Sequence, residues 1–250
     1  MQLIINADDI GSSLDVNNAA VDLMSKGLVT SASLIPNAPY AEEACALAAR
    51  FPGCSFGVHL NVTHYSPLSD PEGVEGLLSS DKVFDGKRIR RISIDSRLAD
   101  GIFNEFCAQI EKLVSLGVKV SHIDSHMQVH TIPRIFPVLK KVQKRFDIRK
   151  VRLSRNIYGS HEKVLKGLRA KKAIYNFFLK YYYRTTTTQG FTDFKTFCEY
   201  GTSRKAKYRV VEVMVHPGAH NSEEETTLLN GPWREALEFP VHLISYNDLG

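Results

Sequence analysis

The chain has 250 residues, of which 43% are hydrophobic, and its formal net charge at pH 7 is +5. This composition is that of an ordinary globular protein and excludes low-complexity and repeat classes. The four cysteines form no CxxC pair, which argues against a disulfide framework or a cysteine zinc site. The N-terminal residues do not resemble a signal peptide, and no apolar run could span a bilayer. We therefore expect a cytoplasmic protein without a transmembrane segment.

Basic residues gather in three stretches, 82–97, 140–150 and 163–184. Solvated helix faces are the simplest interpretation, and an anionic partner is the alternative. No nucleic-acid recognition motif accompanies the charge, so a nucleic-acid partner is not expected. Segment 161–200 is also aromatic, which is typical of a core or an interface, although such residues could stack on sugar rings or approach an anionic, lipid-linked glycan. A homodimer is one option for the assembly.

Strand-like and helix-like patterns alternate along the chain. We expect strands at 3–7, 31–35, 55–62, 118–126, 150–153 and 209–215, a last short element at 241–245, and helices at 16–26, 40–50, 94–116 and 135–146. Residues 64–91 are expected to form a long loop, and residues 161–200 to be partly helical. This alternation favours βαβ units and a parallel sheet. With no convincing linker, residues 1–250 are interpreted as one α/β domain.

The most informative segment is 121–130, which holds three histidines and one aspartate. In a strand, His122, Asp124 and His126 would point to the same face. Polar side chains on a buried face must be paired, so a metal centre or an acid–base site is the simplest explanation.

Further polar residues fall at other expected strand ends, where active sites of parallel α/β folds form. Asp8 and Asp9 follow the first strand, His59 ends the third, and His216 ends a late one. Each has an ordinary alternative: helix capping for the aspartates, and a packed strand histidine for the others. Together they predict a site in which one aspartate binds a cation and the other acts as a base.

An Asp-His-His set with open coordination positions suits zinc and other divalent first-row metals. His216 could protonate a leaving amine. Arg152 could pair with Asp8, although surface solvation is an alternative. Residues that could support the ligands or contact substrate are His122, Asp124, Gln128, His130, Arg152 and Asn61.

An ordered set of motifs resembles the YdjC-like carbohydrate deacetylases, which include chitooligosaccharide and hopanoid-associated branches. The motifs are Asn6-Ala7-Asp8-Asp9-Ile10-Gly11, residues 30–34, Gly57-Val58-His59-Leu60-Asn61-Val62-Thr63, His122-Ile123-Asp124-Ser125-His126, residues 212–218 and Ile244-Ser245-Tyr246. They span nearly the whole chain. Two features depart from the family pattern: Gln128 replaces a common histidine, and residues 163–200 carry no recognisable motif.

The resemblance implies a distorted (β/α) barrel of the TIM-barrel type, related to polysaccharide deacetylases. It also implies removal of N-acetyl groups from a saccharide with the help of a divalent metal ion, zinc or magnesium. By this resemblance Asp9, His59 and His126 hold the metal, Asp8 is the general base and His216 the general acid. Two other functions are considered: a non-haem Fe(II) oxygenase, which uses two histidines and one carboxylate, and a non-catalytic carbohydrate-binding protein.

Overall fold

A curled sheet of parallel strands forms the centre of the protein. The computed structural model describes residues 1–203, 207–220 and 222–250. Within these residues the strand order is β4-β3-β2-β1-β6-β5, and β7 adds to the start of β1. The strands are β1 (Gln2–Ile10), β2 (Ser31–Leu34), β3 (Ser55–Leu60), β4 (Val120–Ser125), β5 (Gly190–Asp193), β6 (Val210–Val215) and β7 (His242–Leu243).

Single bridges connect the two edges of the sheet. Ile123 in β4 pairs with Val151, and the neighbouring Lys150 pairs with Thr186, which precedes β5. Segment 150–153, expected to be a strand, therefore contributes only isolated bridges. The result is an α/β distorted barrel, as the sequence predicts.

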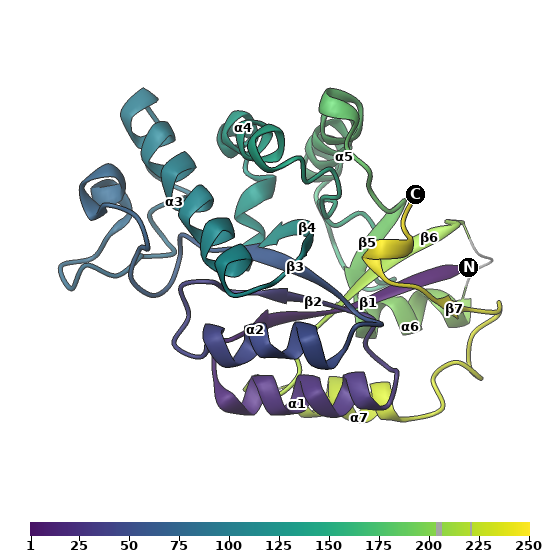
Figure 1. Cartoon of the computed structure of the whole chain (residues 1–250). Helices are drawn as coiled ribbons and strands as arrows, with labels where there is room; N and C mark the ends of the chain where they lie inside the picture. Colours follow the sequence, from purple (N-terminus) through teal and green to yellow (C-terminus); the bar gives the residue numbers. More distant parts are fainter. Residues whose placement is uncertain (204–206, 221) are drawn as a thin grey trace.

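Helices cover the outside of this sheet. In Figure 1, α1, α2 and α7 lie on one side, and α3, α4 and α5 lie on the other. The helices are α1 (Leu14–Ser25), α2 (Ala41–Arg50), α3 (Ser96–Ser115), α4 (Phe136–Phe146), α5 (Lys166–Tyr181), α6 (Phe194–Ser203) and α7 (Glu223–Asn230). Among the described residues, no helix is both long and apolar enough to cross a bilayer.

Most expected elements are present, with shifted ends. Strand β1 extends to Ile10 and so includes Asp8 and Asp9, whereas β4 stops at Ser125 and His126 begins a 3₁₀ turn. Strand β5, within segment 161–200, and helix α7 were not expected from the sequence. The loop after β3 contains a 3₁₀ segment, Pro71–Leu77.

The helix-capping interpretation of the two aspartates is wrong. Ser13 caps α1, because its side chain accepts a hydrogen bond of 3.2 Å from the Val16 amide. This leaves both aspartates available for other contacts.

Candidate metal and acid–base site

An irregularity in β1 orients the side chains of the adjacent residues Asp8 and Asp9. The pairing of β1 with β2 shifts register between Ala7 and Ile10, and Asp9 has a left-handed backbone with φ of 62°. Such bulges redirect side chains that would otherwise alternate across the sheet. As a result, the Asp8 and Asp9 carboxylates both approach His59 at the carboxyl end of the barrel.

Asp9, His59 and His126 form a compact group from three separate elements. One Asp9 oxygen, Oδ1, lies 2.7 Å from Nδ1 of His126 and 3.1 Å from Nε2 of His59. The His59 and His126 rings meet edge to face with centroids 5.7 Å apart. His59 is buried, whereas Asp9 and His126 are partly accessible to solvent. The group therefore lies at the boundary between the barrel interior and solvent.

Asp124 orients His59 from behind. Its Oδ1 is 2.7 Å from Nδ1 of His59, and the two residues are direct partners in the pairing of β3 with β4. In neutral His59, a proton on Nδ1 that is shared with Asp124 would leave the Nε2 lone pair free to bind a metal ion. Carboxylates behind metal-binding imidazoles have this role in many proteins.

The carboxylates around His59 favour its cationic form. Burial lowers the pKa of His59, but the nearby Asp124 and Asp9 carboxylates outweigh burial and raise it to about 10. Burial by itself raises the pKa of Asp9. Hydrogen bonds to His126 and His59 outweigh burial and hold the pKa of Asp9 well below its usual range. The pocket thus attracts positive charge.

Arg152 organises a second, deeper group of carboxylates. Its guanidinium nitrogens lie 2.6 and 2.7 Å from the two oxygens of Asp8 and 2.7 Å from Oδ2 of Asp124. Its Nε donates to Glu212 at 2.7 Å. All four side chains are buried, so the alternative of a solvated Arg152 is wrong. A buried guanidinium shared by three carboxylates compensates charge that water cannot reach.

Glu212 and Tyr246 extend this buried group. Tyr246 donates its hydroxyl hydrogen to Oε2 of Glu212 at 2.5 Å. Burial raises the pKa of Glu212 to about 7, even though Arg152 and the Tyr246 hydrogen bond lower it. Sequence reasoning missed both roles, although a single carboxylate inside the apolar strand β6 is a recognisable signal.

His122 is a packing residue in this structure. Its ring stacks on Tyr246 with centroids 3.7 Å apart, and Nδ1 lies 2.8 Å from the Ser121 hydroxyl. Burial lowers its pKa to about 3, so the ring is neutral at pH 7. The neighbouring strand carries Gly57, where a Cβ atom would lie 2.4 Å from the His122 ring. Among the described residues, no hydrogen bond joins the His122 side chain to Asp9, His59 or His126.

The turn after β4 holds Gln128 and His130. Met127 and Gln128 both have left-handed backbones, with φ of 52° and 53°. His130 is buried and fixes this turn, because Nδ1 is 2.6 Å from the Ser125 hydroxyl and Nε2 is 3.1 Å from the Arg152 carbonyl. Gln128 is partly exposed, and its carbonyl accepts a hydrogen bond from Thr131.

Asn61 shapes the loop after β3. Its Oδ1 accepts hydrogen bonds from the Thr63 amide and hydroxyl and from the His64 amide. The backbone of Asn61 is in turn held by Gln109 of α3. This loop brings the exposed His64 ring to within 4.9 Å of the His126 ring centroid. His64 was not expected near the site from the sequence, although it lies three residues after Asn61.

His216 follows β6 at the same end of the barrel. Strands β1 and β6 are in parallel register, and their last pair is Ala7 with Val215. Asp8 and His216 are the residues that follow this pair in the chain. Its amide donates to Glu225 of α7 at 2.6 Å, and its side chain is partly accessible. All five residues that the sequence analysis grouped thus lie at one edge of the sheet.

The donor atoms indicate which group suits a divalent metal ion. Two sets have ligand atoms within 4.8 Å of one another: Asp9, His59 and His126, and Asp8, His59 and Asp124. In the second set both carboxylates are already paired with Arg152, which would repel a cation. The first set has two imidazoles, one carboxylate and access to solvent, which fits a metal centre with open positions.

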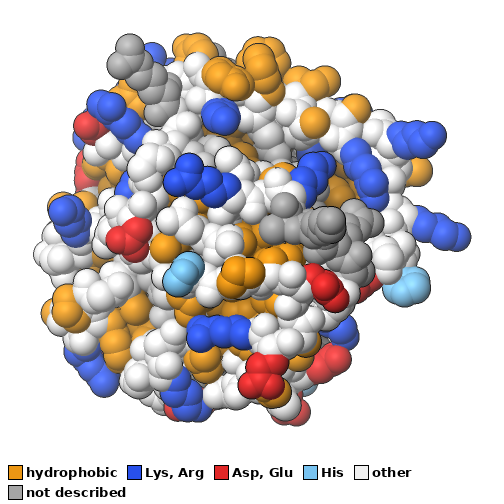
Figure 2. All heavy atoms as spheres, turned by 90° about the vertical axis from the view of Figure 1, so that its right-hand side faces the viewer, with side chains coloured by type: hydrophobic (Ala, Val, Ile, Leu, Met, Phe, Trp, Pro, Cys, Tyr) orange, Lys and Arg blue, Asp and Glu red, His pale blue; other side chains and the backbone are white. Residues whose placement is uncertain are grey.

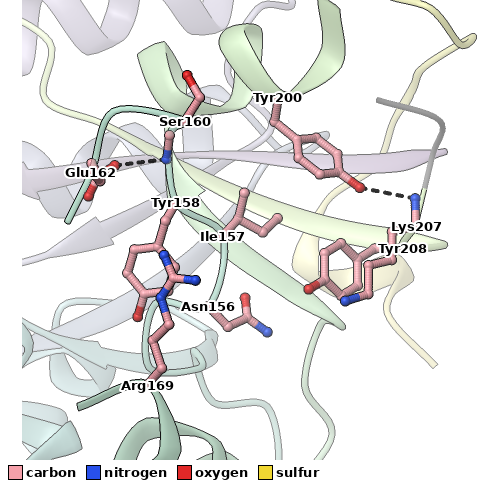
Figure 3. A pocket seen from close by; sticks show the side chains of 10 residues that line it. Asn156, Ile157, Tyr158, Ser160, Glu162, Arg169, Tyr200, Lys207 and Tyr208 are labelled. Atoms are coloured by element: carbon pink, nitrogen blue, oxygen red, sulfur yellow. Dashed lines mark hydrogen bonds between the residues drawn. The ribbon is translucent and has the colours of Figure 1, made fainter. Parts of the chain in front are cut away.

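A separate pocket lies away from this group. It has a volume of about 380 Å³ and is lined by residues including Tyr158, Arg169, Tyr200 and Tyr208 (Figure 3). The Lys207 amide donates to the Tyr200 hydroxyl at 3.0 Å. None of the residues assigned above to metal binding or proton transfer lines this pocket, but Arg169 of the basic, aromatic segment does.

The fold, and the charged residues at the carboxyl end of its sheet, agree with the family to which the sequence is matched. Residues 2–239 match the family of YdjC-like proteins, and the chain belongs to this family. A protein of Brevibacillus brevis named carbohydrate deacetylase is 31% identical over 264 aligned positions, which cover 100% of both chains.

Two further comparisons support the family and the fold. A carbohydrate deacetylase of Geobacillus stearothermophilus is 39% identical over 154 residues, and the match spans 61% of this chain and 60% of that protein. A solved structure of a proposed cellobiose-phosphate cleavage protein from Enterococcus faecalis V583 has a TM-score of 0.80 and 23% identity. It covers 100% of this chain and 98% of its own. This last likeness concerns the fold alone.

Proposed function

We propose that the protein is a metal-dependent hydrolase that removes N-acetyl groups from an amino-sugar-containing carbohydrate. The observation that carries the proposal is the group of Asp9, His59 and His126, with the second carboxylate of Asp8 beside it. The names of the relatives, carbohydrate deacetylases, support the reaction and the substrate class. They also favour hydrolysis over the oxygenase and binding-protein alternatives.

Asp9, His59 and His126 would hold the metal ion. Two imidazoles among three ligands favour zinc or another first-row divalent ion over magnesium, which prefers oxygen ligands. When bound, such an ion lowers the pKa of a coordinated water and polarises a carbonyl group. Asp124 keeps His59 in the tautomer that this binding needs.

Asp8 and His216 would move the protons. Asp8 accepts a proton from the attacking water while the oxygen of that water bonds to the acetamide carbon. His216 then donates a proton to the amine nitrogen as the carbon–nitrogen bond breaks, giving acetate and a free amino sugar. Arg152 and Asn6 hold the Asp8 carboxylate in place through hydrogen bonds of 2.6 to 2.8 Å.

Acetate release from N-acetylglucosamine and its oligomers tests the reaction. We expect activity that a chelator removes and a first-row divalent ion restores. Asp8→Asn should lower kcat by about 10²–10⁴-fold while the protein keeps its metal, because a general base contributes that much. Asp15→Asn, an exposed aspartate of α1, is the matched control. Undiminished turnover by the metal-free protein or by Asp8→Asn would contradict the proposal.

A further inference from the structure

Helix α5 presents an apolar stripe to solvent. Ile174, Phe177, Phe178 and Tyr181 are 54 to 66% exposed and follow the i, i+3, i+4, i+7 spacing of one helix face. The aromatic rings contact one another, with the Phe177 and Tyr181 centroids 4.7 Å apart. The helix is held by its opposite face, where Tyr175 and Leu179 are buried. Contiguous exposed apolar patches of this kind mark interaction sites.

Positive charge surrounds this stripe. Residues 163–192 include no aspartate or glutamate, and they include seven basic residues: Lys163, Lys166, Arg169, Lys171, Lys172, Lys180 and Arg184. Lys171 lies toward one flank of the stripe on the helix, and Lys166 and Lys180 lie toward the other; all three are exposed. Figure 2 shows hydrophobic side chains along the upper edge of the molecule, at the height of α5 in Figure 1, with Lys and Arg side chains beside them.

An apolar groove adjoins the stripe. It has a volume of about 580 Å³ and lies between Pro133 and Phe136 on one side and Ile174, Tyr175 and Phe178 of α5 on the other. An apolar chain inserted beside the stripe would therefore find further apolar surface.

These features discriminate among partners. A second copy that docked through the same face would bring two strongly basic helices together without acidic residues between 163 and 192 to compensate them. Single-stranded nucleic acid would use the rings and the charge, but it gains little from the exposed Ile174. A lipid surface uses all of them, because acyl chains take the apolar stripe and anionic headgroups take the lysines.

We propose that α5 is an interfacial helix that binds the protein to anionic lipid bilayers. The α5 stripe lies in the plane of the headgroups, and the lysines on its flanks contact lipid phosphates. This binding does not depend on the proposed function. On the opposite face of α5, the Tyr175 hydroxyl donates to the His130 carbonyl, so the helix is joined to the turn after β4.

Sedimentation of the full chain with vesicles tests this proposal. Vesicles of phosphatidylcholine alone are compared with vesicles that also contain phosphatidylglycerol. We expect binding to the second kind that weakens as the salt concentration rises, because the lysines act at short range. Binding to neither kind would overturn the proposal.

Two paired variants separate the apolar and the charged contributions. Phe177→Ser/Phe178→Ser should weaken binding to the anionic vesicles by about tenfold or more, since two exposed rings no longer enter the lipid. Val114→Ser/Leu116→Ser, which changes exposed apolar residues near the end of α3, is its control. Lys171→Ala/Lys180→Ala should weaken binding by about tenfold or more. Lys82→Ala/Lys119→Ala is its charge-matched control.

The alternatives have their own signatures. If the protein is a dimer in solution, does not bind vesicles, and becomes monomeric in Phe177→Ser/Phe178→Ser, the face belongs to a second copy. Tight binding of oligonucleotides that prevents vesicle binding would assign it to nucleic acid. Either result overturns the proposal. Acetate release from a soluble sugar should be the same for all four variants, so a failed deacetylase assay leaves the vesicle result interpretable.

Discussion

Two groups of charged residues lie next to each other in this barrel, and they differ in how their charge is compensated. The inner group, Asp8, Asp124, Glu212 and Arg152, is buried and already neutralised in part by the guanidinium. The outer group, Asp9, His59 and His126, is partly open and holds no lysine or arginine. The comparison shows that proximity of ligand atoms does not by itself define a metal site. The group that lacks an internal cation is the one that suits an added cation.

The largest expected effect separates the outer group from its neighbour. Asp9→Ala should weaken metal affinity by at least about 100-fold, because even residues behind the ligands typically contribute 10–100-fold. His64→Gln, which changes a ring 4.9 Å from His126, should leave the metal content unchanged. Elemental analysis of the purified variants measures both. Equal loss of metal in the two variants would mean that the ligand set is wrong.

The inner group is tested by removing its cation. Arg152→Met should lower the free energy of unfolding by about 3–5 kcal/mol, because it leaves buried carboxylates without a partner. Arg145→Met is the control, since Arg145 pairs with Glu111 at 2.9 Å but both side chains are exposed. Its expected cost is about 0–1 kcal/mol. Denaturant unfolding measures the difference, and similar values for the two would contradict the assigned role of Arg152.

A smaller effect concerns the packing below the inner group. Gly57→Ala should lower the free energy of unfolding by about 1–3 kcal/mol, because the new Cβ would displace the His122 ring from Tyr246. Gly53→Ala, where no atom lies within 4 Å of the added Cβ, serves as the control. If His122 is the cause, Gly57→Ala should cost less when His122 is also changed to Ala. If Gly57→Ala lowers the free energy of unfolding by the same amount in the His122→Ala variant, the His122 ring is not the cause.

The smallest effect is a pH slope from Glu212. Arg152, Asp8, Asp124 and Tyr246 are the charged or titratable groups around it. Its pKa rises from 4.5 to about 7 on folding, so the native state keeps a proton that the unfolded state releases. Stability should therefore fall as the pH rises from about 4.5 through 7, by at most about 1.4 kcal/mol per pH unit. Glu212→Gln should remove this part of the slope in thermal or denaturant unfolding. An unaltered slope would show that Glu212 is ionised in the folded protein.

The sequence alone determined the class of fold and the position of most elements. Hydrophobic periodicity located α1 to α4 and most strands, because burial of one face imposes that spacing. It also gathered Asp8, Asp9, His59, His126 and His216 at one edge, because parallel strands place their carboxyl ends together. It failed for β5, which lies inside a polar and aromatic segment.

Only the tertiary structure decided what each polar residue touches. The bulge in β1 sends Asp8 to Arg152 and Asp9 to the histidines, and no spacing rule could assign them. His122 and Asp124 share a face of β4, yet one stacks on Tyr246 and the other orients His59. The α5 stripe has a helical period that reads equally well as core, and its exposure is visible only after folding. Periodicity reports which face a side chain occupies, whereas its partners come from distant strands that only the folded chain brings together.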